Sequence, residues 1–183
     1  MSRIPPKPLS DYPWVIRWVL KRQQRVYGDV LAPSWLWGRL PGAFLGMLAM
    51  LGVFNRKSYP VDQRLRSLLS IRIAQLTGCS FCVDLNAYNF LQSKGEAEKA
   101  ERVAEWRECD DFTEAEQAAL NWAEEMTVRC AEIDDQAMER LRPHFSDDQI
   151  TALSAWIGFQ NLSARFNSAL DAQAHGFCAP PKR

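Results

Sequence analysis

Hydrophobic side chains recur at helical spacing along most of the chain. Over residues 11–27 they fall three to four positions apart rather than at every second position, which is typical of an amphipathic helix. The residues that define this pattern are Trp14, Val15, Trp18, Val19 and Val26. Asp11 can cap the start of this helix, and Gly28 suits the turn after its end. We therefore expect a helix over 11–27.

The next segment, residues 32–54, is rich in Trp, Pro and Gly and predicts short helical pieces. Within it, residues 40–55 carry no charge and are interrupted by Pro41 and three glycines. This uncharged stretch is shorter than the roughly 20 apolar residues that a membrane-spanning helix needs. We expect no membrane association, and instead a buried hairpin or a contact between subunits.

Residues 60–77 are apolar at most positions, which predicts a helix at the centre of the fold. Gly78 suits the left-handed turn that ends such a helix, so a new helix begins at Cys79. Three arginines of the central helix must reach solvent or carboxylates, because a buried unpaired charge is costly. They are Arg64, Arg66 and Arg72.

Two capping boxes mark the starts of later helices. Thr113 with Glu116, and Ser146 with Gln149, have the spacing at which the first side chain and the third after it exchange hydrogen bonds with the helix backbone. The second box opens a long helix that runs to Leu170. No strand pair with hairpin turns is visible, so the expected fold class is all-α.

The composition is that of one globular domain. The chain has 183 residues, of which 47% are hydrophobic, enough for a sizeable core. We expect a single domain over 1–183, with a helical extension over 1–60 and a loose tail over 175–183 that contains two prolines.

Charge and cysteine usage narrow the function classes. The 22 basic and 22 acidic residues give zero net charge, which argues against a nucleic-acid binder. The first thirteen residues lack the apolar region of a secretion signal, so a cytoplasmic protein is expected. Its five cysteines are then thiols unless they do redox work.

The candidate chemistry lies at Cys79-Ser-Phe-Cys82. Residues three apart on a helix have Cβ atoms about 5–6 Å apart, so a small adjustment brings the two thiols within disulfide reach. The exposed N–H groups at a helix N-terminus stabilise a thiolate and make it reactive. The pair is therefore a candidate redox dithiol, whereas the structural alternative is two buried core cysteines.

A metal site is the other structural alternative. A closed zinc site needs four ligands, and the chain has no second Cys-x-x-Cys. His144 and His175 are isolated from each other, and the remaining cysteines have no ligand spacing. We expect neither a metal nor a cofactor, and a structural role for the remaining cysteines, which are Cys109, Cys130 and Cys178.

Residues 67–86 resemble the signature of the carboxymuconolactone decarboxylase and alkylhydroperoxidase D superfamily. In its peroxidase members the pattern is E-x11-C-x-x-C-x3-H, preceded by Arg-x-x-Gln-x-Asn-Gly. Arg72, Gln75, Gly78, Cys79 and Cys82 stand where this pattern places them, and Thr77 replaces the asparagine. Residues 120–127 and 145–150 also resemble the family. The similarity covers about 61–170, and residues 1–60 match faintly.

The resemblance implies a thiol-dependent peroxidase or dithiol–disulfide oxidoreductase. In it Cys82 attacks a small peroxide or disulfide substrate, Cys79 closes the disulfide, and an external thiol reductant reopens it. The helix-dipole argument instead favours Cys79 as the thiol with the lower pKa, so the attacking residue stays open. The resemblance also implies a homo-oligomer, a trimer or a hexamer.

The chain departs from the family pattern at two positions. Ser67 stands in place of the glutamate and Asn86 in place of the histidine that relay a proton in peroxidase members. Neither side chain titrates near neutral pH, so we expect weak peroxidase activity. Asn86 can hydrogen-bond a Cys82 thiolate, Asp84 is expected to face solvent, and His144 is a candidate to replace the missing base.

Two alternative functions remain open at this point. A decarboxylase-like lyase would use the arginines of the central helix, Arg64, Arg66 and Arg72, to hold carboxylates, but it has no role for the cysteine pair. A member that binds a ligand or a partner without turnover would explain the lost relay residues but not the retained cysteines. Trp35, Trp37 and the apolar stretch after them are candidates for a cover over the dithiol or an oligomer contact.

Overall fold

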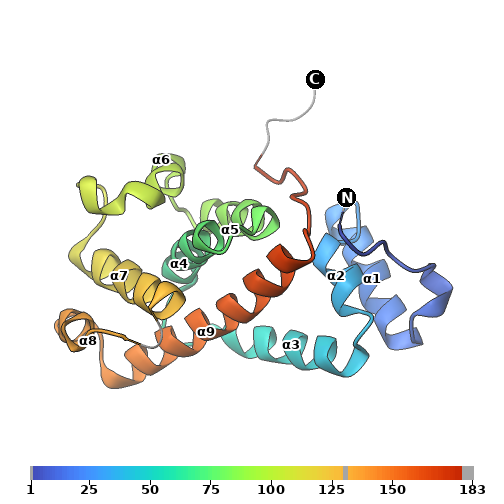
Figure 1. The fold of residues 1–183 in the computed structure, drawn as a ribbon, viewed down its shortest axis with the longest axis horizontal. Coiled ribbons are helices and arrows are strands. Elements are labelled where there is room, and N and C mark those ends of the chain that lie inside the picture. Colours follow the sequence, from blue (N-terminus) through green and yellow to red (C-terminus); the bar gives the residue numbers. More distant parts are fainter. Residues whose placement is uncertain (1, 130–131, 179–183) are drawn as a thin grey trace.

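The computed structural model describes residues 2–129 and 132–178, and every regular element in those ranges is helical (Figure 1), which confirms the all-α prediction. The elements are η1 (Leu9–Asp11), α1 (Trp14–Tyr27), α2 (Ala32–Trp37), α3 (Pro41–Phe54), α4 (Gln63–Leu76), α5 (Ser80–Gln92), α6 (Ala97–Glu101), η2 (Arg102–Glu108), α7 (Glu114–Val128), α8 (Asp135–Leu141) and α9 (Asp147–Ala169).

Helix α4 lies at the centre of the fold, as its apolar sequence predicts. It packs against α5, α7, α9 and η2. Nearly all of its side chains from Leu65 to Ala74 are buried, including the polar Ser67 and Ser70. The Asp62 side chain caps the helix by accepting a hydrogen bond from the Leu65 N–H. The helix therefore begins at Gln63, three residues after the predicted start at residue 60. Gly78, with φ of +68°, separates α4 from α5.

Both predicted capping boxes are present. The Thr113 hydroxyl accepts from the Glu116 N–H while the Glu116 carboxylate accepts from the Thr113 N–H, and Ser146 and Gln149 make the same exchange. The second box opens the 23-residue helix α9, which runs the length of the helical core (Figure 1). Cys130, for which a structural role is expected, is outside the described residues.

Two expectations for the N-terminal helices are wrong. Helix α1 begins after Pro13 rather than Asp11, because Asp11 belongs to the short helix η1 and its carboxylate accepts from the Ser10 hydroxyl. The uncharged stretch forms the continuous helix α3 and not a hairpin. Pro41 occupies the first turn of α3, where a missing N–H costs nothing, and none of its glycines has the positive φ of a tight turn.

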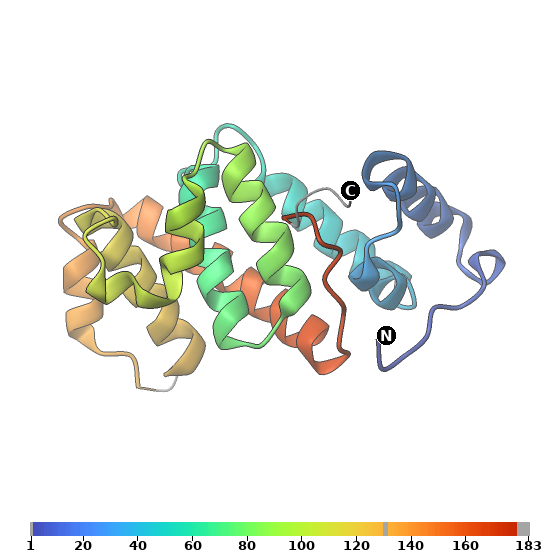
Figure 2. The same cartoon turned by 90° about the horizontal axis from the view of Figure 1, so that it is seen from above.

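The N-terminal helices have their own small core and stand beside the C-terminal end of α9 (Figures 1 and 2). Ile16 and Leu20 of α1 pack with Trp37 and Phe44 of α2 and α3. Trp37 also stacks on Phe166 of α9, with ring centroids 3.8 Å apart. No helix in the described residues has both the length and the apolar character needed to cross a bilayer.

The described part of the tail, residues 175–178, is hydrogen-bonded to α5. Figure 2 shows the chain after α9 running between α5 and the N-terminal helices. The Asp84 carboxylate, expected in solvent, accepts hydrogen bonds from the backbone N–H groups of residues 175–178. A carboxylate that faces four N–H donors satisfies them and holds the segment on α5. Residues 179–183 are outside the described ranges.

Candidate redox site

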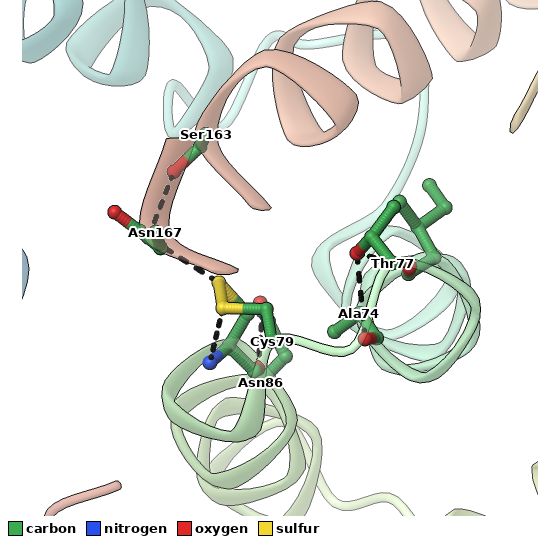
Figure 3. Close-up of a disulfide and its surroundings, with 8 residues drawn as sticks. Ala74, Thr77, Cys79, Asn86, Ser163 and Asn167 are labelled. Atoms are coloured by element: carbon green, nitrogen blue, oxygen red, sulfur yellow. Dashed lines mark hydrogen bonds between the residues drawn. A yellow bond between two sulfur atoms is a disulfide. The ribbon is translucent and has the colours of Figure 1, made fainter. Parts of the chain in front are cut away.

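Cys79 and Cys82 form a disulfide at the start of α5 (Figure 3). Cys79 is the N-cap residue of this helix, and its Sγ accepts from the Cys82 N–H at 3.2 Å. The Cα atoms are 5.2 Å apart, inside the usual range for a disulfide. The positive φ of Gly78 turns the chain so that the pair stands at the helix N-terminus, as the sequence spacing predicts.

The two sulfurs differ in access. Both residues are buried, with 1% of Cys79 and 3% of Cys82 exposed, but Cys82 lines a cavity of about 710 Å³ whose lining does not include Cys79. The cavity is formed by α1, α3, α4, α5 and α9, so the N-terminal helices cover the disulfide on one side. Its apolar lining includes Phe44, Met47, Leu48, Phe81, Trp156 and Phe159. The volume is that of a small-molecule site.

Trp35 and Trp37 take no part in this cover. Neither lines the cavity, and Trp37 is engaged with Phe166. The apolar residues of α3 supply the wall instead. The expectation of a cover over the dithiol therefore holds for the stretch after the two tryptophans and not for the tryptophans themselves.

Asn167 of α9 is a site residue that the sequence analysis missed. Its Nδ2 donates to Cys82 Sγ at 3.4 Å and to Ser163 Oγ at 3.5 Å, and it is 2% exposed (Figure 3). Its Oδ1 is buried without a hydrogen-bond partner among the described residues. The signal that could have identified it is a row of polar residues at helical spacing, Gln160, Ser163 and Asn167, along one face of the helix.

The residues that replace the family glutamate and histidine both line the same cavity. Ser67 is 4% and Asn86 is 8% exposed. Asn86 Nδ2 donates to the Cys82 carbonyl oxygen at 2.7 Å and not to the sulfur. The side-chain donor to this sulfur is therefore Asn167, and the serine hydroxyl and two amides near it carry no titratable group.

His144 does not lie at this site, so its candidacy as a replacement base is wrong. It stands before the first turn of α9, whereas Asn167 lies twenty residues into that helix, or about 30 Å away at 1.5 Å per residue. The other histidine, His175, belongs to the tail. Its Nε2 accepts from the Ala32 N–H, and its ring contacts Phe81 with centroids 5.7 Å apart.

Arg72, which matches the family pattern, points away from the cavity. Its Nε donates to Glu124, which also accepts from Trp106 and pairs with Arg107. Burial raises the pKa of Glu124, but these hydrogen bonds outweigh it and hold the pKa below its ordinary value. Arg72 is thus paired, as predicted, within a structural network.

Arg64 and Arg66 have different surroundings although both come from α4. Arg64 lies within 3.7 Å of the Glu116 carboxylate and 3.5 Å of the Glu96 carboxylate. Arg66 lines the cavity, is 4% exposed and makes no ion pair within the described ranges. Of the three arginines considered for binding carboxylates, Arg66 alone faces the cavity that holds Cys82.

The cavity offers no metal site. Within residues 2–129 and 132–178, no three His, Cys, Asp or Glu side chains are grouped so as to hold an ion. Its described lining contains no carboxylate and no imidazole. The chemistry that this arrangement supports is that of a sulfur pair beside a mostly apolar chamber, whose polar lining includes amides, two serine hydroxyls and the Arg66 guanidinium.

Comparisons with known proteins identify the family and relatives of the chain. The carboxymuconolactone decarboxylase family model matches residues 47–125. The uncharacterized protein YnjA of Escherichia coli K12 is 42% identical over 176 residues, which is 96% of this chain and 97% of the relative.

Two solved structures share the fold. An uncharacterized peroxidase-related protein from Ralstonia eutropha JMP134, with an alkylhydroperoxidase AhpD core, superposes with a TM-score of 0.85 at 21% identity, over 96% of this chain and 94% of its own. The debrominase Bmp8 superposes with a TM-score of 0.75 at 20% identity, over 94% of this chain and 91% of its own.

The family match covers the cysteine pair and the two helices that present it, and the relative and the structures extend the likeness to nearly the whole chain. The chain belongs to the carboxymuconolactone decarboxylase and alkylhydroperoxidase D-like superfamily.

Proposed function

We propose that the protein is a dithiol–disulfide oxidoreductase that reduces small hydroperoxides through Cys79 and Cys82. The observation that carries this proposal is the disulfide of Cys79 with Cys82, whose second sulfur lines a cavity of about 710 Å³. A thiol pair that only stabilises a core needs no chamber beside one of its sulfurs.

The reaction begins with both cysteines reduced. The Cys82 thiolate attacks the outer peroxide oxygen, an S–O bond forms, the O–O bond breaks, and the leaving alkoxide takes a proton to become an alcohol, or water when the substrate is hydrogen peroxide. The Cys79 thiol then attacks the sulfenic sulfur, the disulfide forms and water leaves. An external dithiol returns the pair to thiols through exchange and is itself oxidised to a disulfide.

Access supports Cys82 as the attacking residue. It is the sulfur that borders the cavity, and the Asn167 amide donates to it. Cys79 receives the backbone N–H of Cys82 and lies outside the lining, which suits a residue that reacts only with its neighbour. The assignment agrees with the role implied by the family resemblance.

The environment of the cysteine pair also predicts a slow reaction. General acid–base catalysis contributes roughly a hundredfold to ten-thousandfold when a titratable group is in reach. With Ser67 and Asn86 in the cavity and no carboxylate or imidazole in its described lining, the alkoxide must take its proton from water or from a thiol. We expect a peroxidase weaker than members that keep the relay.

The other functions weighed from the sequence fit the site less well. For a decarboxylating lyase, Arg66 supplies one cationic group, but the described lining holds no carboxylic acid and no imidazole to protonate a carbanion. For a member without turnover, nothing explains a disulfide beside the cavity.

Reductive dehalogenation is a second candidate. The debrominase Bmp8 shares the fold over 94% of this chain, and a variant of it has been solved with 2,3,4-tribromopyrrole. Here, Trp156, Phe159 and Phe81 give the cavity aromatic walls that suit a flat ring. In such a reaction the dithiol would be oxidised to the disulfide while the carbon–bromine bond is replaced by carbon–hydrogen, with release of bromide and a proton.

The test measures peroxide consumption with dithiothreitol as the reductant, for the wild type and the variants Cys79→Ser and Cys82→Ser. Both variants should lose turnover. Cys79→Ser should still form one equivalent of sulfenic acid that dimedone traps at Cys82. Cys178→Ser, which removes an exposed free thiol, is the matched control and should keep full activity. Turnover that survives both substitutions would refute the proposal.

The same protein incubated with dithiothreitol and a bromopyrrole separates the two candidates. Bromide release in place of peroxide consumption would favour dehalogenation. Failure of both reactions, with a disulfide that forms readily, would favour a redox-sensing partner protein.

A further inference from the structure

Arg66 is a buried cation in the described lining of the cavity, and its guanidinium has few partners. It lies over the Trp156 ring at 5.0 Å and the Tyr59 ring at 5.3 Å from each centroid. Its Nη1 donates to Asn55 Oδ1 at a long 3.4 Å, and its Nε is buried without a partner among the described residues. A guanidinium has five donors, so most of its hydrogen-bonding capacity is unused.

The Asp62 carboxylate forms no ion pair with Arg66. Asp62 lies one helical turn earlier, but its side chain caps α4 and accepts from the Leu65 N–H. Burial lowers the pKa of Arg66, and Tyr59 and Asp62 raise it in part. An arginine still stays protonated near neutral pH, so the charge persists in a largely apolar wall.

The rest of the lining adds a second positive charge and no negative one in its described part. Arg22, exposed on α1, borders the same cavity, where it lies over the Trp18 ring at 5.7 Å. No aspartate or glutamate belongs to the described lining. A low-dielectric chamber lined by arginines with no described counter-ion attracts and holds anions.

The geometry favours one anionic group on an otherwise apolar molecule. A single buried guanidinium matches a planar carboxylate, which it can bind through two parallel hydrogen bonds. A phosphate, with more charge to neutralise, needs further cationic donors, and apart from the exposed Arg22 and Tyr27 the other polar side chains of the described lining are amides and two serine hydroxyls. The aromatic walls at Trp156 and Phe159 suit an apolar body.

We propose that this cavity binds carboxylic acids with an apolar chain or ring, and that Arg66 pairs with their carboxylate. The part of this inference that concerns the reaction rests on the proposed function. It assigns hydroperoxides of such acids as the substrate class. One equivalent of acid hydroperoxide and the reduced Cys79–Cys82 dithiol then give the hydroxy acid, water and the disulfide. The binding step itself is independent of any turnover.

The first experiment therefore measures binding to the disulfide form, which cannot reduce a peroxide. Calorimetric titrations with octanoate and with 1-octanol compare two probes of similar apolar length. We expect the wild type to bind octanoate at least tenfold more tightly, since charge-assisted hydrogen bonds exceed neutral ones. Equal affinity for the two probes would overturn the proposal, and this comparison requires no variant.

Variants then locate the effect. Arg66→Met should abolish the preference for octanoate, and Arg66→Lys, which keeps the charge, should retain part of it. Arg25→Met is the matched control, because Arg25 is exposed on α1 outside the cavity, and it should bind like the wild type. A preference that persists in a folded Arg66→Met variant would overturn the assignment to Arg66.

The second experiment uses turnover. With dithiothreitol as reductant, the wild type should reduce the hydroperoxide of linoleic acid faster than that of its methyl ester, and Arg66→Met should remove the difference. Reduction of both at equal rates by the wild type would overturn the substrate class. If no hydroperoxide is reduced at all, the proposed peroxidase function fails, and the octanoate titration still decides the binding proposal.

Discussion

The Asn167 side chain donates from Nδ2 to Cys82 Sγ at 3.4 Å, joining residues that are 85 positions apart in the chain. This contact ties the last helix to the redox pair. Because an N–H donor favours a sulfur that carries negative charge, the amide stabilises the Cys82 thiolate relative to the thiol. The described lining contains no carboxylate and no imidazole, so this amide is the side-chain hydrogen-bond donor that the tertiary structure brings to the sulfur.

Replacing Asn167 by Ala should therefore slow the reaction of reduced Cys82. We expect its thiolate to form at higher pH and its alkylation at pH 7 to slow by about tenfold, as befits the loss of one charge-assisted hydrogen bond. The measurement is the pH dependence of iodoacetamide labelling, followed at the Cys82 peptide by mass spectrometry. Ser163→Ala, which removes a hydroxyl bonded to Asn167 but not to sulfur, should change little. An unaltered labelling profile in Asn167→Ala would contradict this role.

Restoring the family pair through Ser67→Glu with Asn86→His should raise peroxide turnover. Both positions line the cavity beside Cys82, so the new groups can accept and return a proton there. Steady-state rates with dithiothreitol and hydrogen peroxide test this, with each single substitution as the control. A rate unchanged from the wild type would show that the missing relay does not limit the reaction.

Asp84→Ala should release the segment 175–178 from α5. Four backbone N–H groups lose their shared acceptor, so these amides should exchange hydrogen at least tenfold faster. Hydrogen exchange with mass spectrometry reports it. Asp110→Ala, at an exposed position, is the control and should leave the tail protected. Equal protection in both variants would show that contacts other than Asp84 hold the segment.

Glu124→Gln should destabilise the fold at neutral pH by about 2–4 kcal/mol, because Arg72 would lose a partly buried partner. The pKa of Glu124 is held below its ordinary value, so its stabilising charge is present at neutral pH and is lost as pH falls through the lowered pKa. The difference between variant and wild type should therefore shrink in acid. Urea unfolding at pH 7 and below pH 4 measures it.

The matched control is Glu139→Gln, in which an exposed ion pair with Arg142 is weakened and little stability should be lost. A deficit in Glu124→Gln that stays constant with pH would show that its charge is not the cause.

The oligomeric state remains a prediction from the family resemblance. Helix α3 carries no charged residue, and Leu45, Met50 and Val53 are exposed on it. We expect a trimer or a hexamer in light scattering after size exclusion, and a smaller species for Met50→Glu with Val53→Glu. Gln136→Glu on α8 is the control and should leave the mass unchanged. A monomeric wild type would contradict the expectation.

The features that the sequence predicted correctly rest on neighbours a few positions apart. The two capping boxes, the turns at Gly28 and Gly78, and the face shared by Cys79 and Cys82 each depend on contacts within about one helical turn. The periodic spacing of apolar residues predicted the helices correctly, because this spacing also reflects neighbours about one helical turn apart. Fold class and the candidate dithiol could therefore be predicted from spacing alone.

The features that the sequence failed to predict depend on which helices and segments pack against one another. The glycines of α3 suggested a hairpin, because glycine permits a turn without requiring one, and the adopted conformation is helical. Asp84 was placed in solvent from its position on α5, and the tail that covers it comes from 91 residues further along the chain. His144 is a candidate base by residue type, but the length of α9 separates it from the cysteines.

The amino-acid sequence by itself determined the helices, their caps and the reach of one thiol to the other, since these follow from the geometry of a single turn. Only the tertiary structure decided that Cys82 Sγ borders the cavity and that the Asn167 amide donates to it. It also decided that Arg66, rather than Arg64 or Arg72, lines the cavity. Those outcomes depend on how α1, α3, α4, α5 and α9 pack together, and packing between distant segments is set by complementary surfaces that no local spacing encodes.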